Sequence, residues 1–316
     1  ATGTYAVPSG LSVGEHEAVE LRDRDPARYA GKGVLNCLEH IYRTLAPILI
    51  GREAQEQEQL DHEMISADGT PNKAKLGANT LLSLSGAIAK AQAQSLKIPL
   101  YKYIAALTKE DKKLDVPAPM FNILNGGLHG GKNLDFQEYL LVPQANVAYS
   151  KALRTGVEIY YALKEVIVAH NGLVLLGDEG GYAPTLYANI DGFKIMEEAT
   201  IKAGYQLGID VFFSMDVAAS NLKIGGAYKV KDRPVSMNGG DFIDFYKSLL
   251  EQYHLLSIED PLGEDDWGDW EKMVSQLGAE TIIIGDDLIT TNMDRLKKAI
   301  QNKAVTGVII KPNQVG

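Results

Sequence analysis

The stretch Leu255-Leu256-Ser257-Ile258-Glu259 is a short apolar run that ends in a charged side chain. Three other runs have the same form and end at Asp216, Asp286 and Lys311. A run too short for a helix, followed by an amphipathic helix, is the repeating unit of a (β/α) barrel. Since charges at the carboxyl ends of such strands meet at one mouth, the sequence predicts a barrel with a polar site there.

The order of strand and helix signals predicts a barrel that begins ββαα and then alternates strictly. Seven strands are expected, at 120–124, at 139–142 and in the runs that end at Glu179, Asp216, Glu259, Asp286 and Lys311. Helices are expected at 147–170, 191–203, 241–253, 266–277 and 293–302. One more βα unit would close the barrel.

The first part of the chain is predicted to be mainly helical, with helices at 34–49 and 75–95. A charged stretch at 109–113, followed by Pro117 and Pro119, is the predicted linker. We therefore expect an N-terminal domain at 1–112 and a barrel domain at 113–316. Because the chain starts without Met and stops directly after a strand, we expect the first domain to be incomplete at its start and the second at its end.

Composition excludes several classes of protein. The net charge of −10 argues against a nucleic-acid partner, because phosphate binding needs a basic face, and an anionic substrate would need locally concentrated cations. Cys37 is the only cysteine, so no intrachain disulfide forms and a reducing compartment is expected. With neither a membrane-length apolar run nor a signal-peptide pattern, the sequence predicts a cytoplasmic protein, with a second location at the cell surface left open.

Asp216, Glu259 and Asp286 follow three successive strands and predict a divalent-metal site. Carboxylate oxygens suit Mg²⁺ or Mn²⁺ better than zinc or copper, which favour His and Cys. A single acid after a strand is equally well explained as a helix cap. Three in series together with Lys311 favour the metal site.

Two further residues are candidates for proton transfer. Lys311 ends an apolar strand, where nearby cations would lower the pKa of its ammonium group toward that of a base, although a lone lysine there is more often a rim charge. Glu179 lies in the glycine-rich stretch 177–184, and a carboxyl across the mouth from a base would act as a general acid. The alternative for Glu179 is a plain loop residue.

His129 is the histidine with the best case for a functional role. It lies in the glycine-rich loop 125–131, and Gln137 and Glu138 follow shortly after, so that Glu138 could orient the ring. Ser12 lies in the loop 8–14, which by itself is a weak signal. The other histidines, interpreted as structural, are His16, His40, His62, His170 and His254.

The combination resembles the enolase (phosphopyruvate hydratase) family over nearly the whole chain. The stretches that carry the resemblance, in family order, are 7–10, 72–79, 122–129, 137–138, 177–184, 257–261, 264–267, 286–288 and 310–314. The resemblance implies an N-terminal α+β domain capping a ββαα(βα)₆ barrel. It also implies a lyase that interconverts 2-phosphoglycerate and phosphoenolpyruvate plus water in glycolysis and gluconeogenesis, acting as a homodimer or higher oligomer.

The resemblance also implies a role for each candidate residue. Two Mg²⁺ ions are expected per site, the first held by the three carboxylates and the second by Ser12 with the substrate phosphate. Lys311 would be the proton acceptor and Glu179 the proton donor. The substrate would contact His129, Gln137 and Glu138.

Some features depart from the family pattern. Leu11 and Val13 stand where Ala and Thr are usual, and Leu128 replaces a small or polar residue before His129. The family's His-Arg-Ser strand end and a later substrate-binding lysine are not in this sequence. We therefore assign the activity to the complete protein.

Two alternatives remain from the sequence. One is a non-catalytic homologue with a binding role, such as plasminogen binding at a surface, or a structural role, which the intact catalytic positions disfavour. The other is a different enzyme of the superfamily, which would usually carry a Lys-x-Lys pair on an earlier strand. The strands expected at 120–124, 139–142 and 173–177 contain no such pair.

Overall fold

The computed structural model describes residues 1–108 and 113–316. The chain divides into two compact units, each described here by itself. Unit 1 comprises Ala1–Leu114, Thr290–Asn292 and Ile310–Gly316, and unit 2 comprises Asp115–Ile289 and Met293–Ile309. The domain boundary expected after residue 112, and most of the predicted linker 109–113, lie outside the described residues. That boundary stays a prediction.

Unit 1 is built of helices around a small apolar core. Its helical elements are η1 (Tyr29–Gly31), α1 (Leu35–His40), η2 (Ile41–Leu45), α2 (Ala46–Leu49), α3 (Gln57–Asp68), α4 (Ala78–Ser95), α5 (Leu100–Leu107) and η4 (Pro312–Gln314). Leu45, Met64, Leu76 and Leu81 form the buried core. The helix predicted at 34–49 is present but divided at η2, a π-helical turn. Helices α3 and α5 were not predicted, and α3 carries many Gln and Glu residues that obscure its apolar face.

The described part of unit 1 contains no β-strand, so the β portion of the expected α+β domain does not form there. The extended segment around Val19 finds its backbone partners in loops instead. Val19 N–H donates to Asn72 (2.8 Å), Ala78 N–H donates to Val19 (2.8 Å), and Ala18 N–H donates to Gln314 (2.8 Å). These bonds satisfy an extended chain that has no neighbouring strand.

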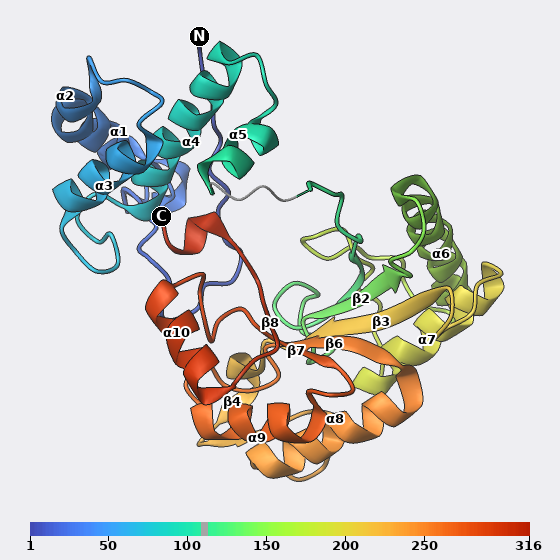
Figure 1. The fold of residues 1–316 in the computed structure, drawn as a ribbon. Helices are drawn as coiled ribbons and strands as arrows, with labels where there is room; N and C mark the ends of the chain where they lie inside the picture. Colours follow the sequence, from blue (N-terminus) through green and yellow to red (C-terminus); the bar gives the residue numbers. More distant parts are fainter. Residues whose placement is uncertain (109–112) are drawn as a thin grey trace. The chain divides into compact units, whose positions relative to one another are not determined.

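Unit 2 is organised around a six-stranded sheet in the order β1-β2-β3-β6-β7-β8 (Figure 1). The strands are β1 (Phe121–Asn125), β2 (Glu138–Pro143), β3 (Val211–Asp216), β6 (Leu255–Glu259), β7 (Ile282–Gly285) and β8 (Gly307–Val308). β2 runs antiparallel to both β1 and β3, and the sheet is parallel from β3 onward. This is the predicted ββ start followed by βα units.

The helices of unit 2 lie where the sequence predicted them. They are α6 (Tyr149–Ala169), α7 (Asn189–Lys202), α8 (Gly239–Tyr253), α9 (Trp267–Leu277) and α10 (Met293–Asn302). Their apolar residues and those of the strands form one large buried cluster. In Figure 1, α6 to α9 lie along the outer side of the curved sheet. Among the described residues, no helix is long and apolar enough to cross a membrane.

The strand expected to end at Glu179 does not form, and a single residue takes its place. Tyr182 pairs with β1, because Asn125 N–H donates to its carbonyl (2.8 Å) and its own N–H donates to Ile123 (2.9 Å). The preceding chain turns back on itself at Gly177 and Gly181, whose backbones hydrogen-bond at 2.7 Å. Because these backbone groups bond within the turn, they are not available for the hydrogen bonds of a longer strand beside β1.

Two smaller differences concern later strands. A short hairpin, β4 (Lys223–Ile224) with β5 (Ala227–Tyr228), was not predicted. The last strand, β8, is only two residues long, so Lys311 lies three residues beyond its end and belongs to unit 1. The pairing with β7 fades here, because Ile309 N–H still donates to Gly285 (3.2 Å) but Ile310 is 65% exposed and does not belong to the core.

Phe193 on α7 joins helix and sheet, and its loss should destabilise unit 2. Its ring is fully buried and stacks on Tyr253 (5.1 Å) and against Tyr139 (4.9 Å). We expect Phe193→Ala to lower the free energy of unfolding by about 3–5 kcal/mol, measured by denaturant titration. The control Ile201→Ala removes an exposed residue of the same helix and should change it by less than about 0.5 kcal/mol. Equal effects would contradict this account of the core.

Candidate active site

The register of three parallel strands brings the predicted metal ligands to one edge of the sheet. Asp216 at the end of β3 pairs with Glu259 at the end of β6, and Glu259 pairs with Ile284 on β7. Asp286 follows β7 by one residue. Asp216 is 6% exposed and Asp286 is 7% exposed, so negative charge gathers in a buried place. Among the described residues, the acidic oxygen atoms within 4.8 Å of Asp286 are those of Asp260 and Asp287, so a shared ion held by Asp216, Glu259 and Asp286 stays a prediction.

Two hydrogen bonds hold the Asp216 carboxylate in place. Its Oδ2 accepts a hydrogen bond from Gln137 Nε2 (3.0 Å), and its Oδ1 accepts one from the Ala218 N–H (3.0 Å). The pKa of Asp216 is raised to about 8, mainly by burial and also by the negative charges of Glu138 and Asp286, while the hydrogen bonds from Gln137 and Ala218 oppose the rise. A carboxylate in this position needs either a proton or a cation beside it.

A second cluster contains His129, Glu138 and Glu179, whose ligand atoms lie within 4.8 Å of one another. His129 Nδ1 lies 3.2 Å from Glu138 Oε1 and 3.8 Å from Glu179 Oε1. The pKa of Glu138 is raised to about 7, mainly by burial and also by the bond to Glu179, while the bond to His129 opposes the rise. The bond to Glu138 in turn raises the pKa of His129. The cluster therefore retains a proton near neutral pH.

Register also joins the two clusters, because Glu138 on β2 pairs with Asp216 on β3. His129 reaches Glu138 through the glycine-rich loop. A Cβ at Gly130 would lie 2.3 Å from the Asn125 carbonyl, so only glycine fits this close approach. Gly130 N–H donates to Gly126 (2.6 Å), which closes the loop.

Residues that the sequence did not single out also support the site. Asn122 Nδ2 donates to Glu179 Oε2 (3.1 Å), which fixes the carboxyl that was predicted to act as the acid. Asp260, directly after Glu259, is 4% exposed, and its carboxylate accepts from the N–H groups of Asp286 (2.9 Å) and Asp287 (2.8 Å). Both residues could have been found from the sequence, because Asn122 is a polar residue inside a predicted strand and Asp260 directly follows one.

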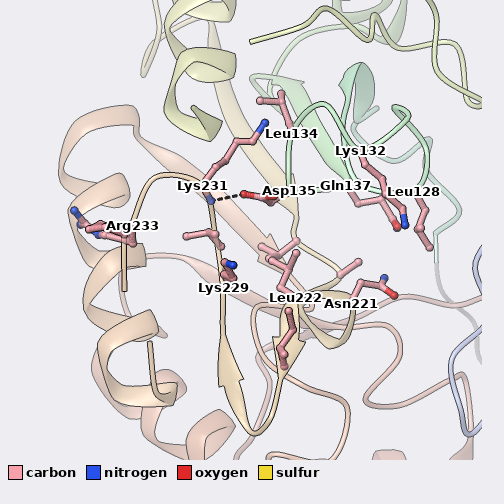
Figure 2. Close-up of a pocket in the computed structure, with 16 residues that line it drawn as sticks. Leu128, Lys132, Leu134, Asp135, Gln137, Asn221, Leu222, Lys229, Lys231 and Arg233 are labelled. Atoms are coloured by element: carbon pink, nitrogen blue, oxygen red, sulfur yellow. Dashed lines mark hydrogen bonds between the residues drawn. The ribbon is translucent and has the colours of Figure 1, made fainter. Parts of the chain in front are cut away.

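A cavity of about 570 Å³ is lined in part by Gln137, the residue whose amide donates to Asp216 (Figure 2). Leu134, Val217, Leu222 and Val230 supply apolar lining, and Leu128 stands exposed at its rim. The cationic residues that line it are Lys132, Lys229, Lys231 and Arg233. Arg233 points away from the other labelled residues in Figure 2 and lies over the Phe245 ring.

Lys311 and Ser12 belong to unit 1, unlike the residues above. Lys311 N–H donates to Thr291 Oγ1 (2.9 Å) within that unit. Leu11 and Val13, which flank Ser12, are exposed. The roles assigned to Lys311 and Ser12 stay predictions.

The described residues of unit 2 fit a divalent cation by two observations. The acidic groups are hard oxygen donors, and Asp260, Asp286 and Asp287 bring oxygen atoms within 4.8 Å of one another. In the described part of the chain, Gln137 Oε1 and His129 Nε2 are also buried without a hydrogen-bond partner. Such buried polar atoms indicate a ligand that completes them.

A barrel that begins ββαα and collects carboxylates at the ends of its parallel strands defines the class of protein, a lyase of the enolase superfamily. Comparison with known families agrees. Residues 113–316 match the family described as "Enolase, C-terminal TIM barrel domain", and residues 1–104 match "Enolase, N-terminal domain". The chain belongs to the enolase family.

The raised pKa of Asp216 predicts how the metal-free protein responds to pH. Between pH 3.8 and about 8 the folded protein keeps a proton on Asp216 that the unfolded chain releases, so stability falls as pH rises. In EDTA, the melting temperature should fall across this window, and Asp216→Asn should flatten the dependence. The exposed control Asp244→Asn should leave it unchanged. A wild-type profile that rises across the window would contradict the assignment.

Proposed function

We propose that the complete protein interconverts 2-phosphoglycerate and phosphoenolpyruvate plus water, with Mg²⁺ as its cofactor. The observation that carries this proposal is the meeting of two clusters in unit 2. Asp216, Glu259 and Asp286 end neighbouring strands, and Glu138 beside Asp216 links them to His129 and Glu179. A cation site next to a proton-holding site is what removal of a proton and a hydroxyl from one substrate requires.

Charge counting supports the need for metal. Asp216, Glu259 and Asp286 would hold one Mg²⁺ and leave a formal charge of −1, which disfavours a substrate that carries a carboxylate and a phosphate. Each contact between opposite charges at about 4 Å contributes up to ~4 kcal/mol at an effective dielectric near 20. A bound divalent cation supplies stabilisation of the negative charge that develops on the substrate carboxylate. A second ion, with Ser12 as a ligand, is part of the proposal.

The chain's own residues supply the proton transfers. Lys311, as a neutral amine, would accept the proton from C2 of the substrate. Glu179, oriented by the Asn122 amide, would deliver a proton to the departing C3 hydroxyl. The pKa of Glu138, about 7, keeps a proton in the same cluster at neutral pH. His129 and Gln137 have buried polar atoms that are suited to holding the substrate.

The cavity beside Gln137 suits an anionic substrate. The protein carries a net charge of −10, yet cationic residues line this cavity. Lys132 and Lys229 both line the cavity together with Gln137 (Figure 2). A local concentration of cations on an acidic protein attracts an anionic ligand to that place. The cytoplasmic location, the glycolytic role and the homodimer belong to the same proposal.

Replacing the proposed base should stop the reaction without removing the metal. We expect Lys311→Ala to lower kcat by at least about 100-fold, because general-base catalysis contributes roughly 100- to 10,000-fold. The assay follows the ultraviolet absorbance of the enol phosphate in the complete protein. Lys164→Ala, an exposed lysine on α6, serves as the control. Turnover near wild type in Lys311→Ala would refute the base assignment.

Replacing a proposed metal ligand should weaken metal binding directly. Glu259→Gln keeps the size of the side chain but removes its charge. We expect it to raise the Kd for Mg²⁺ by at least about 10-fold in calorimetric titration, since even residues that only support ligands contribute about 10–100-fold. Glu251→Gln on α8 is the exposed control. An unchanged titration would remove Glu259 from the ligand set, and metal binding without turnover in the wild type would favour the non-catalytic alternative.

A further inference from the structure

Asp260 makes hydrogen bonds with two other loops at the mouth of the sheet in unit 2. It follows β6, and its N–H donates to Ile284 on β7 (3.0 Å), while its carbonyl accepts from Ala219 in the loop after β3 (3.0 Å). Its carboxylate accepts from Asp286 N–H (2.9 Å) and Asp287 N–H (2.8 Å). One buried residue thus joins the ends of three strands.

Each of these bonds lies close to a proposed metal ligand. Glu259 is the residue before Asp260, Asp286 is bonded to it directly, and Asp216 lies three residues before Ala219. The two N–H groups that the carboxylate accepts from belong to a turn whose first residue, Asp286, is buried. Without an acceptor, a buried N–H costs about 1–3 kcal/mol, so the turn would rearrange to find another one.

The backbone at Asp260 is also held in an unusual conformation. Its φ of +41° is in the left-handed region, which residues other than glycine rarely adopt and which Asn and Asp tolerate best. Strain of this kind persists where surrounding contacts over-determine the geometry. At Asp260 those contacts are the four hydrogen bonds.

We propose that Asp260 is a positioning residue whose carboxylate holds the Asp286 turn against the end of β6, so that Glu259 and Asp286 can bind one divalent cation together. The inference rests on the proposed metal site. It adds to that site a residue that holds the metal ligands in position. Loss of the Asp260 carboxylate should therefore weaken metal binding more than it lowers the stability of the fold.

The test compares two variants of Asp260 with a control in the full-length protein. Asp260→Asn keeps the size and tolerates the backbone conformation but places an amide NH₂ against one of the two N–H groups. Asp260→Glu keeps the charge but displaces the acceptor oxygens by one methylene. Asp244→Asn on α8 removes an exposed aspartate of the same unit. The probe is Mn²⁺, with free ion measured by electron paramagnetic resonance in the absence of substrate.

We expect both Asp260 variants to raise the Kd for Mn²⁺ by about 10–100-fold, the range found when residues that orient metal ligands are replaced. With Mg²⁺ at saturation, kcat should return to within about 3-fold of wild type, so the loss lies in metal affinity. Asp244→Asn should bind Mn²⁺ as the wild type does.

Three results would overturn the proposal. In the first, Asp260→Asn melts at a lower temperature in EDTA but keeps the wild-type Kd, which would make the residue merely structural. In the second, Asp260→Glu binds Mn²⁺ like wild type, which would show that the charge of residue 260 matters for metal binding and the position of its oxygen atoms does not. This result would overturn the proposal even if Asp260→Asn did not fold. In the third, the wild type binds no Mn²⁺, which would also end the proposed function. A wild type that binds Mn²⁺ without turnover, together with weakened variants, would defeat the proposed reaction and support the role of Asp260.

Discussion

The concentration of negative charge at the ends of three adjacent strands is the constraint on which the rest of unit 2 depends. Strand register places Asp216 beside Glu259, and Asp286 follows the next strand; Asp216 and Asp286 are buried and Glu259 is half-buried. Carboxylates in such surroundings repel one another and lose hydration, so protons or a cation must compensate them. The raised pKa of Asp216 records that demand. The same demand is what makes these strand ends a candidate cation site.

The two neighbouring clusters handle charge in different ways. At the strand ends, Asp216 accepts hydrogen bonds from Gln137 Nε2 and the Ala218 N–H, and its raised pKa keeps a proton on it near neutral pH. In the cluster next to it, His129 and a shared proton compensate Glu138 and Glu179 from within the protein. Because β2 pairs with β3, Glu138 and Asp216 lie on adjacent strands, so the two clusters are neighbours. The proposed reaction uses both clusters.

Much of this could be predicted from the order of residues. The strands at Val211–Asp216 and Leu255–Glu259 end at the predicted residues, and helix Met293–Asn302 has the predicted bounds. These elements were predictable because each is a regular apolar pattern that stops at a clearly polar or charged residue. The carboxylates were found for the same reason, since a charge directly after an apolar run is visible without any knowledge of distant contacts.

The sequence by itself determined the barrel order, the ends of the central strands and the acidic residues placed there, because those features follow from local periodicity. Only the tertiary structure decided that Tyr182 replaces the strand expected before Glu179, and that Asp260 joins three loops. Both outcomes depend on backbone partners far away in the chain, such as Ile123 for Tyr182 and Ala219 for Asp260. Hydrogen bonds between residues this distant have no period and leave no local pattern to read.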